Sequence, residues 1–340
     1  MNNLNFQDRF RICENRDINN GICLNRAERT ERWSDEIMSD IKKEIEFTKL
    51  GSYYDIDDFH IKYSEYLNVD KDYILITNGA DEAIKDIFFI YAKENDNIMF
   101  PTPTYGMYNV YTQMFKCNSI QIDYDNNFKI NKKKIYNNLN STKIFFLPNP
   151  NHNEDNFELD EISNICNILE KNNGIMVVDE TYYGFGSKSV VDLLSKHSNI
   201  FIIRSFSKTF GLPGIRIGCL ISNYKYQVTK LRGGYEISYI SYRIGLYFLN
   251  NINIINNYID ECIEGRNYLI EELNKNKIKF NGKTGYIFNI IFENDTISKE
   301  IYDKLWEEKI YVRIYKNMLG ITISPKKYLE KFFNKLIKYI

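Results

Sequence analysis

The sequence predicts an α/β protein with a mainly parallel, seven-stranded sheet in a large domain and a smaller α+β domain at the C-terminus. Two observations support this prediction. Short apolar runs alternate with helix-length segments over most of the 340 residues, which is typical of a parallel sheet covered by helices on both faces. Beyond about residue 245 the pattern changes to a long helical stretch followed by separate strand-like runs.

The expected strands of the large sheet are short and rich in Ile, Val and Phe. They cover Tyr73–Thr77, Asn97–Phe100, Ser119–Asp123, Lys143–Leu147, Ile175–Val178, Ile200–Ile203 and Ile215–Ile221. Helices are expected over 34–48, where Ile37, Ile41 and Ile45 form a stripe at helical spacing, and over 57–67 and 80–92.

The C-terminal third predicts a second, smaller unit. After a helical stretch over about residues 240–275, strands are expected at Tyr286–Phe292, Ile310–Ile314 and Gly320–Ile323. The first residues have weak periodicity and look like an arm. We therefore expect an arm at residues 1–33, a large domain at 34–245 and a small domain at 246–340.

Composition excludes several classes of protein. The 44 Lys and Arg residues nearly balance the 45 Asp and Glu residues, so no overall charge favours nucleic acid or an anionic membrane. The six cysteines form no CxxC pair and there are three histidines, which favours free thiols in a reducing compartment and no metal site. The N-terminus is polar and no apolar run has the length of a membrane span, so a cytoplasmic protein is expected.

Residues that follow the strands are candidates for the site, because ligands of α/β proteins bind beyond the carboxyl ends of the strands. After the first strand, the turn with Asn78 and Gly79 opens a helix whose amides at Ala80 and Asp81 would attract an anion. A plain strand-to-helix turn would use the same residues. After the second strand, Tyr105 could stack on a planar ring, or it could be structural in a chain with 27 tyrosines.

Three later strands also end in polar residues. Asn151 and His152 follow the strand that ends at Leu147, in a segment that also reads as an ordinary Asn/Pro turn. Asp179 directly follows an apolar strand, where a buried carboxylate needs a partner, unless it caps a helix.

The connection after Ile203 carries the densest cluster of reactive groups. A lysine amine can form an imine, and hydroxyl and guanidinium groups can hold a phosphate. The groups concerned are Ser205, Ser207, Lys208 and Arg216. They are embedded among Phe and Leu residues, which disfavours a solvated basic loop.

Taken together and in this order, these segments resemble the class I and II aminotransferases of fold type I, which depend on pyridoxal phosphate. Within them the sequence is most similar to the histidinol-phosphate aminotransferase group, over about residues 50–325. The most specific part is SFSKTFGLPGIRIG around Lys208, with DETY at Asp179–Tyr182 upstream. Each short motif is weak alone, whereas the ordered set is specific.

The resemblance implies that pyridoxal 5'-phosphate is the cofactor and that Lys208 binds it as a Schiff base and later moves a proton. By the same resemblance, Asp179 pairs with the pyridine nitrogen, Tyr182 donates to the phenolate oxygen and Tyr105 stacks on the ring. The cofactor phosphate would be held by the turn at Gly79, Ala80 and Asp81 together with Ser205, Ser207 and Arg216.

The resemblance also implies a homodimer with shared active sites. The segment at residues 51–55 is similar to the family segment whose tyrosine reaches the phosphate of the neighbouring subunit. Tyr53 is the favoured residue and Tyr54 the alternative.

The chain departs from the family pattern at two places. His152 stands where the family usually has the asparagine that contacts the phenolate oxygen, and a histidine N–H can still donate there. Gly320 stands where an arginine usually binds the substrate carboxylate. Arg313 matches a second family arginine, and Arg26 and Arg29 are the nearest other candidates for binding a substrate anion, unless they belong to a solvated arm.

These residues favour an aminotransferase that acts on a small, plausibly phosphorylated, amino compound or its keto or aldehyde partner. The alternative on the same architecture is a decarboxylase of a phosphorylated amino acid, because fold does not determine which bond is broken. A homologue that binds the cofactor or a partner without catalysis is a third interpretation. The joint presence of Lys208, Asp179 and Arg216 argues against it.

Overall fold

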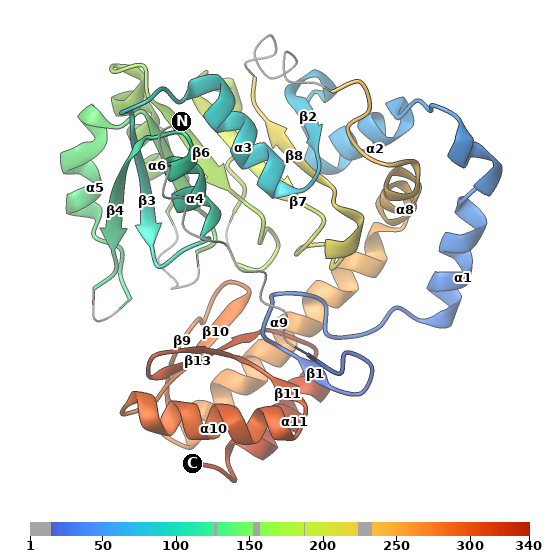
Figure 1. Cartoon of the computed structure of the whole chain (residues 1–340), viewed down its shortest axis with the longest axis vertical. Helices are drawn as coiled ribbons and strands as arrows, with labels where there is room; N and C mark the ends of the chain where they lie inside the picture. The colour runs from blue at the N-terminus through green and yellow to red at the C-terminus, as the bar shows by residue number, and fades with distance from the viewer. Residues whose placement is uncertain (1–14, 126–127, 152–156, 187, 224–232) are drawn as a thin grey trace, which may run out of the picture.

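The computed structural model describes residues 15–125, 128–151, 157–186, 188–223 and 233–340. Its large sheet has seven strands in the order β2-β8-β7-β6-β5-β3-β4, which confirms the predicted fold class (Figure 1). Strand β8 runs antiparallel to both of its neighbours, and the other pairs are parallel. The strands are β2 (Ile74–Thr77), β3 (Asn97–Thr102), β4 (Asn118–Asp123), β5 (Ile144–Pro148), β6 (Ile175–Asp179), β7 (Ile200–Ser205) and β8 (Gly218–Ile221).

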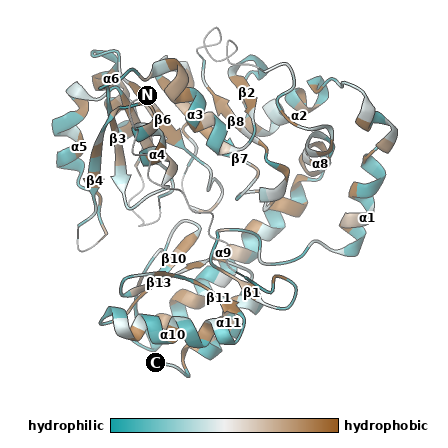
Figure 2. Cartoon of the chain, in the orientation of Figure 1, coloured by the Kyte–Doolittle hydropathy of each residue, from teal (hydrophilic) through white to brown (hydrophobic). Residues whose placement is uncertain are grey.

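Both faces of β2, β5, β6, β7 and β8 are buried, which explains why these strands read as continuous apolar runs, whereas the edge strand β4 is mostly exposed. Alternate residues point to opposite faces: Ile144 and Phe146 of β5 join one core cluster, and Phe145 and Leu147 join the other. Helices α3 (Ala80–Tyr91) and α4 (Met107–Met114) cover the first face. The second face is covered by α2 (Asp57–Leu67), α5 (Lys132–Asn138), α6 (Leu159–Glu170) and α8 (Tyr239–Asn250). In Figure 2 strands such as β2 and β8 are largely brown, while the edge strand β4 and the outer sides of the helices carry teal residues.

The C-terminal part builds a second sheet, of four antiparallel strands in the order β12-β13-β10-β9. These strands are β9 (Lys279–Asn281), β10 (Ile287–Ile291), β12 (Arg313–Tyr315) and β13 (Met318–Thr322). Helices α9 (Ile252–Lys275), α10 (Asp295–Glu307) and α11 (Lys326–Leu336) pack with it, and α9 leads from the large sheet to the small one (Figure 1).

The arm is tied to the small unit. Strand β1 (Ile22–Cys23) pairs in parallel with β11 (Ile310–Tyr311). Farther along, the carbonyl of Leu24 accepts hydrogen bonds from the amide and the hydroxyl of Thr322. Helix α1 (Asp35–Glu44) then follows, with Ser34 as its N-cap.

Several predicted elements differ in detail. The helical stretch over 240–275 is two helices, because the backbone of Asn251 leaves the helical region between α8 and α9. The strand expected at Ile310–Ile314 is interrupted at Val312, and β9 was not predicted. The last large-sheet strand begins at Gly218, because Pro213–Ile215 form a 3₁₀ turn and Arg216 is left-handed.

The predicted domain division at residue 245 falls inside α8, which packs on α1 and α2, and the division stays a prediction. Among the described residues, no helix combines the length and the apolar character required to cross a bilayer.

Candidate active site

A cavity of about 170 Å³ opens at the carboxyl ends of the central strands. The elements that contribute to it are the start of α3, the start of α4 and the loop before it, the ends of β5, β6 and β7, and the loops after β6 and β7. It therefore brings together residues from all five predicted strand-end segments, although Gly79 and Asn151 are not among its lining residues. Its lining residues are Ala80, Asp81, Thr104, Tyr105, Tyr108, Pro148, Asp179, Thr181, Tyr182, Ser205, Ser207, Lys208, Pro213 and Arg216.

Lys208 supplies a buried amine to this cavity. Its Nζ donates to the backbone carbonyl of Arg26 at 3.0 Å. Burial lowers the pKa of Lys208 to about 8, and the nearby charges of Arg313 and Arg216 act in the same direction, against the carboxylate of Glu28. At pH 7 about a tenth of this amine is therefore uncharged, far more than for an ordinary lysine, and a nucleophile or a base requires the uncharged form.

Asp179 supplies a buried carboxylate at the tip of β6. Its Oδ2 accepts from the hydroxyl of Tyr108 at 2.5 Å, and its Oδ1 accepts from the amide of Thr181 at 3.0 Å. Burial raises the pKa of Asp179, and the two hydrogen bonds oppose that rise. A carboxylate can accept further bonds, so Asp179 can still receive a proton donor from a ligand.

Two tyrosines flank the cavity with different surroundings. Tyr182 packs against Tyr286 with 5.6 Å between ring centroids, and burial raises the pKa of the Tyr182 hydroxyl, which keeps it protonated as a donor. Tyr105 is partly exposed, and its hydroxyl donates to the carboxylate of Asp81. Its ring meets that of Tyr108 edge-on at 6.0 Å.

The opposite end of the cavity is an anion-binding corner. Helix α3 begins at Ala80, so its first amides lack acceptors within the helix and carry the positive end of its dipole. Arg216 reaches Ser207 Oγ at 3.3 Å and Asp81 Oδ2 at 3.5 Å. Both contacts are long, which leaves the guanidinium able to turn to a stronger acceptor such as a phosphate.

Gly79 makes this corner possible. Its φ is +79°, and a Cβ there would lie 2.4 Å from Nη2 of Arg216. Glycine tolerates that backbone conformation at no steric cost. The close approach of Arg216 to the turn therefore depends on a residue without a side chain.

A buried ion pair between Arg204 and Glu180 lies next to the cavity residues. Arg204 Nε donates to Glu180 Oε2 at 2.6 Å, and the Val190 amide donates to Glu180 Oε1 at 2.6 Å. Glu180 and Arg204 directly adjoin Asp179 and Ser205 in sequence, so the pair links the ends of β6 and β7. Removal of one partner would leave an uncompensated buried charge, which is strongly destabilising.

Some predicted residues lie apart from the lining. Asn151 is buried next to Gly285, and His152 lies outside the described residues. Tyr53 is 83% exposed and stacks on Tyr235, whereas Tyr54 donates its hydroxyl to the carbonyl of Ile237.

The three predicted substrate arginines have different surroundings. Arg313 lies on the small sheet, close enough for its charge to lower the pKa of both Lys208 and Tyr182. Arg26 reaches Lys208 through its backbone. The guanidinium of Arg29 is packed between the rings of Trp33 and Tyr258, at 3.8 and 3.6 Å from their centroids. Arg29 is therefore engaged in packing the arm, and its substrate role stays a prediction.

The residues present fit pyridoxal 5'-phosphate. The Oγ1 atoms of Thr104 and Thr181 are buried without a hydrogen-bond partner among the described residues, and both threonines line the cavity. Unpaired buried hydroxyls favour a polar ligand. The cavity also offers an amine, a carboxylate, a tyrosine donor and an anion-binding corner, which match the carbonyl, ring nitrogen, phenolate and phosphate of that molecule.

Sequence reasoning missed Tyr108, Thr104 and Thr181. Tyr108 stands three residues after Tyr105, in the first turn of α4, and the two rings meet edge-on. That spacing was the available signal for Tyr108. The two threonines have no distinguishing pattern in the sequence, and only their orphaned hydroxyls identify them.

Comparison with known proteins agrees with this geometry. Residues 21–335 match the family of class I and II aminotransferases. A histidinol-phosphate aminotransferase from Buchnera aphidicola subsp. Cinara cedri is 33% identical, covering 87% of this chain and 88% of that one. Another from Clostridium novyi is 30% identical, covering 86% of this chain and 85% of the relative.

Solved structures show the same fold. The crystal structure of the histidinol-phosphate aminotransferase from Clostridium acetobutylicum has a TM-score of 0.80 at 21% identity and covers 93% of this chain and 98% of its own. That of the Sinorhizobium meliloti enzyme in complex with pyridoxal-5'-phosphate has a TM-score of 0.82 at 15% identity, covering 94% of this chain and 90% of its own.

Proposed function

Because the chain belongs to the class I and II aminotransferases and is a pyridoxal-phosphate-dependent transaminase, we propose that its amino substrate is a small phosphorylated compound. Histidinol phosphate is the first candidate, since it appears in the names of the relatives. The observation that most supports the site is that Lys208, Asp179 and Arg216 line one cavity.

Each residue has a proposed part in the reaction. When bound, the cofactor supplies an electron sink for the bonds of the substrate's Cα. Lys208 Nζ takes the proton from Cα and returns it elsewhere on the reacting system, which requires its lowered pKa. Asp179 holds a proton on the ring nitrogen, and Tyr182 donates to the phenolate oxygen. The amides of Ala80 and Asp81 with Ser205, Ser207 and Arg216 hold the phosphate.

Arg313 is the proposed residue for the substrate's own anion. It is a cation on the small sheet, its charge reaches Lys208 and Tyr182, and its guanidinium is exposed. The decarboxylase alternative is not favoured, because the relatives at 30% identity and above are named as aminotransferases.

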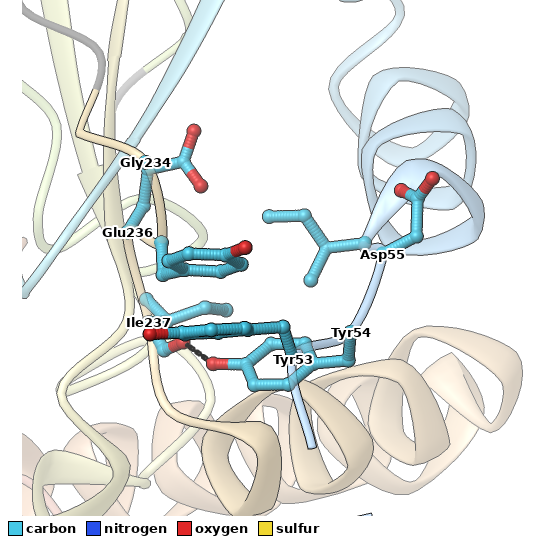
Figure 3. A pocket seen from close by; sticks show the side chains of 8 residues that line it. Tyr53, Tyr54, Asp55, Gly234, Glu236 and Ile237 are labelled. Atoms are coloured by element: carbon cyan, nitrogen blue, oxygen red, sulfur yellow. Dashed lines mark hydrogen bonds between the residues drawn. The ribbon is translucent and has the colours of Figure 1, made fainter.

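A homodimer is the proposed assembly. Several large apolar side chains near Tyr53 are exposed, and a second copy would cover them: Phe47, Leu50, Tyr53, Tyr235 and Ile240. Both tyrosines line a hollow of about 330 Å³, but Tyr53 is exposed, whereas the hydroxyl of Tyr54 is engaged with the carbonyl of Ile237 (Figure 3). This difference supports Tyr53 as the residue that reaches the partner's cofactor phosphate.

A cytoplasmic location is also proposed. The described cysteines are all free thiols, at Cys23, Cys117, Cys166, Cys219 and Cys262. Free cysteines are typical of a reducing compartment.

A spectral titration tests the proposed function. Purified holoenzyme is mixed with histidinol phosphate, and the absorbance of the cofactor is followed, then 2-oxoglutarate is added. We expect conversion to the pyridoxamine form and its reversal by the keto acid. Release of carbon dioxide without pyridoxamine formation would show a decarboxylase instead, and no reaction with any phosphorylated amine would refute the substrate class.

A further inference from the structure

Three residues form a row across the small sheet. Arg313 on β12 lies directly opposite Gly320 on β13, which in turn lies opposite Asn289 on β10. Residues directly opposite each other in a sheet point to the same face. Thr322 lies two residues beyond Gly320 on β13 and therefore on the same face, and its hydroxyl oxygen accepts from the Ala27 amide at 3.0 Å. The adjacent carbonyl of Arg26 accepts from Nζ of Lys208 at 3.0 Å, so this face is turned toward the Lys208 end of the cavity.

Tyr315 occupies the space above the middle of this row. It is two residues from Arg313 on the same strand, and therefore on the same face. A Cβ built on Gly320 would lie 3.0 Å from the Tyr315 ring and 3.2 Å from Oδ1 of Asn289. The ring of Tyr315 thus covers Gly320, and the absence of a side chain there is what permits it.

Tyr315 also holds Arg313. The guanidinium donates from Nη1 to the Tyr315 hydroxyl oxygen at 2.6 Å. Because that oxygen accepts, its own proton stays available to a ligand. The remaining N–H groups of Arg313 and this O–H form neighbouring donors, while Asn289 at the other end of the row presents an acceptor near Gly320. An anion is therefore favoured at the Arg313 end.

We propose that Tyr315 is a specificity-determining residue, which covers Gly320 and orients Arg313 so that the two side chains together bind a phosphate on the substrate. A phosphate has three oxygens able to accept from both groups at once, and charge-assisted bonds of this kind are strong. The inference rests on the proposed function and adds to it the residue that selects phosphorylated over unphosphorylated amines.

The test compares two ligands that differ only in the phosphate. Binding of L-histidinol phosphate and of L-histidinol to the holoenzyme is measured by calorimetry for the wild type, Tyr315→Phe and Arg313→Ala. Tyr315→Phe keeps the ring over Gly320 and removes the hydroxyl. We expect this variant to bind histidinol phosphate about tenfold more weakly, as for loss of a hydrogen bond to a charged group. Its affinity for histidinol and its cofactor spectrum should be unchanged. Tyr328→Phe on α11 is the matched control.

A second pair of variants tests the covering role. Gly320→Ala should weaken the binding of histidinol phosphate, because the added Cβ forces the Tyr315 ring to move. The same change in a Tyr315→Ala background should have a smaller further effect, since the ring is gone and only the contact with Asn289 remains. Equal weakening in both backgrounds would overturn the covering role.

The outcomes separate the two proposals. A wild-type enzyme that binds both amines equally would refute the phosphorylated substrate and the inference with it. A wild type that prefers histidinol phosphate, with the same preference in Tyr315→Phe, would overturn the inference alone.

Discussion

The two ends of the proposed site are built in different ways. The cofactor end lies on the large sheet, where Asp179, Ser205 and Ser207 are buried and several contacts come from backbone amides. The substrate end lies on the small sheet, where Arg313 and Tyr315 are exposed and contact each other through side chains. Lys208 stands between them, bonded to the arm at Arg26.

This difference indicates which end is preorganised. Backbone amides and buried carboxylates are fixed by the fold, so they are already placed before a ligand binds. Exposed side chains such as Arg313 and Tyr315 on β12 can be exchanged at small cost to the fold. We therefore expect variants at the cofactor end to reduce the rate of reaction or cofactor affinity, and variants at the substrate end to change which amine binds.

The largest effect is expected at Asp179. Asp179→Asn should keep the fold and lower kcat by about 100- to 1,000-fold, because a preorganised electrostatic contact of this kind contributes about 3–4 kcal/mol. Steady-state kinetics with histidinol phosphate measure this loss of kcat. The control is Asp192→Asn, since Asp192 lies outside the cavity. Near-wild-type turnover in Asp179→Asn would contradict the role of this carboxylate.

A glycine variant tests the anion-binding corner. Gly79→Ala should weaken cofactor binding by about tenfold or more, since its Cβ would displace Arg216 and its φ is left-handed. Gly214 lies in the same region and has open space around its Cβ position, so the control variant Gly214→Ala should bind the cofactor with wild-type affinity. Titration of cofactor-free protein with pyridoxal phosphate compares the affinities of the two variants. Equal affinities would show that the approach of Arg216 to Gly79 does not contribute to cofactor binding.

Tyr108 offers an intermediate effect on the same end of the site. Tyr108→Phe removes one of the two hydrogen bonds that hold down the pKa of Asp179, so that pKa should rise further. The acidic limb of the pH–kcat profile should then move to higher pH, with a loss of about fivefold to tenfold in kcat, corresponding to about 1–1.5 kcal/mol. Tyr111→Phe on the same helix is the control, and an unmoved acidic limb would show that Tyr108 serves packing only.

The smallest effect is a pH dependence of cofactor capture. The pKa of Lys208 is lowered to about 8 from the usual 10.5, and only the neutral amine attacks a carbonyl. The rate at which cofactor-free protein captures pyridoxal phosphate should therefore rise with pH and level off above about pH 8. The unfolded chain binds more protons between the two pKa values, so the stability of the cofactor-free protein should rise with pH in that window. A capture rate still rising steeply at pH 10 would contradict the lowered pKa.

The contrast between the two ends also explains what the sequence could predict. The segments around Lys208 and Asp179 were recognisable because their residues are close in sequence and follow apolar strands. The contact of Lys208 with Arg26, the bond between Tyr108 and Asp179, and the row across Arg313 and Gly320 join residues distant in the chain or on separate strands. Strand register and domain packing determine such pairs, and neither can be predicted from a local motif.

The fold was predictable to a similar extent. All seven large-sheet strands were expected, because burial on both faces gives the inner strands distinct apolar runs, and Ile120 and Ile122 alternate with polar residues in the edge strand β4. The separation of α8 from α9 at Asn251 and the short strand β9 were not, since one non-helical residue and a three-residue strand leave almost no periodic signal.

The attachment of the cofactor to Lys208 is the central claim, and one measurement tests it directly. Holoenzyme is reduced with borohydride, digested, and the peptides that carry the cofactor are identified by mass spectrometry. We expect the reduced cofactor to be attached to the peptide containing Lys208, and this label to be absent in Lys208→Ala. A label on a different lysine, or an undiminished label in Lys208→Ala, would contradict it.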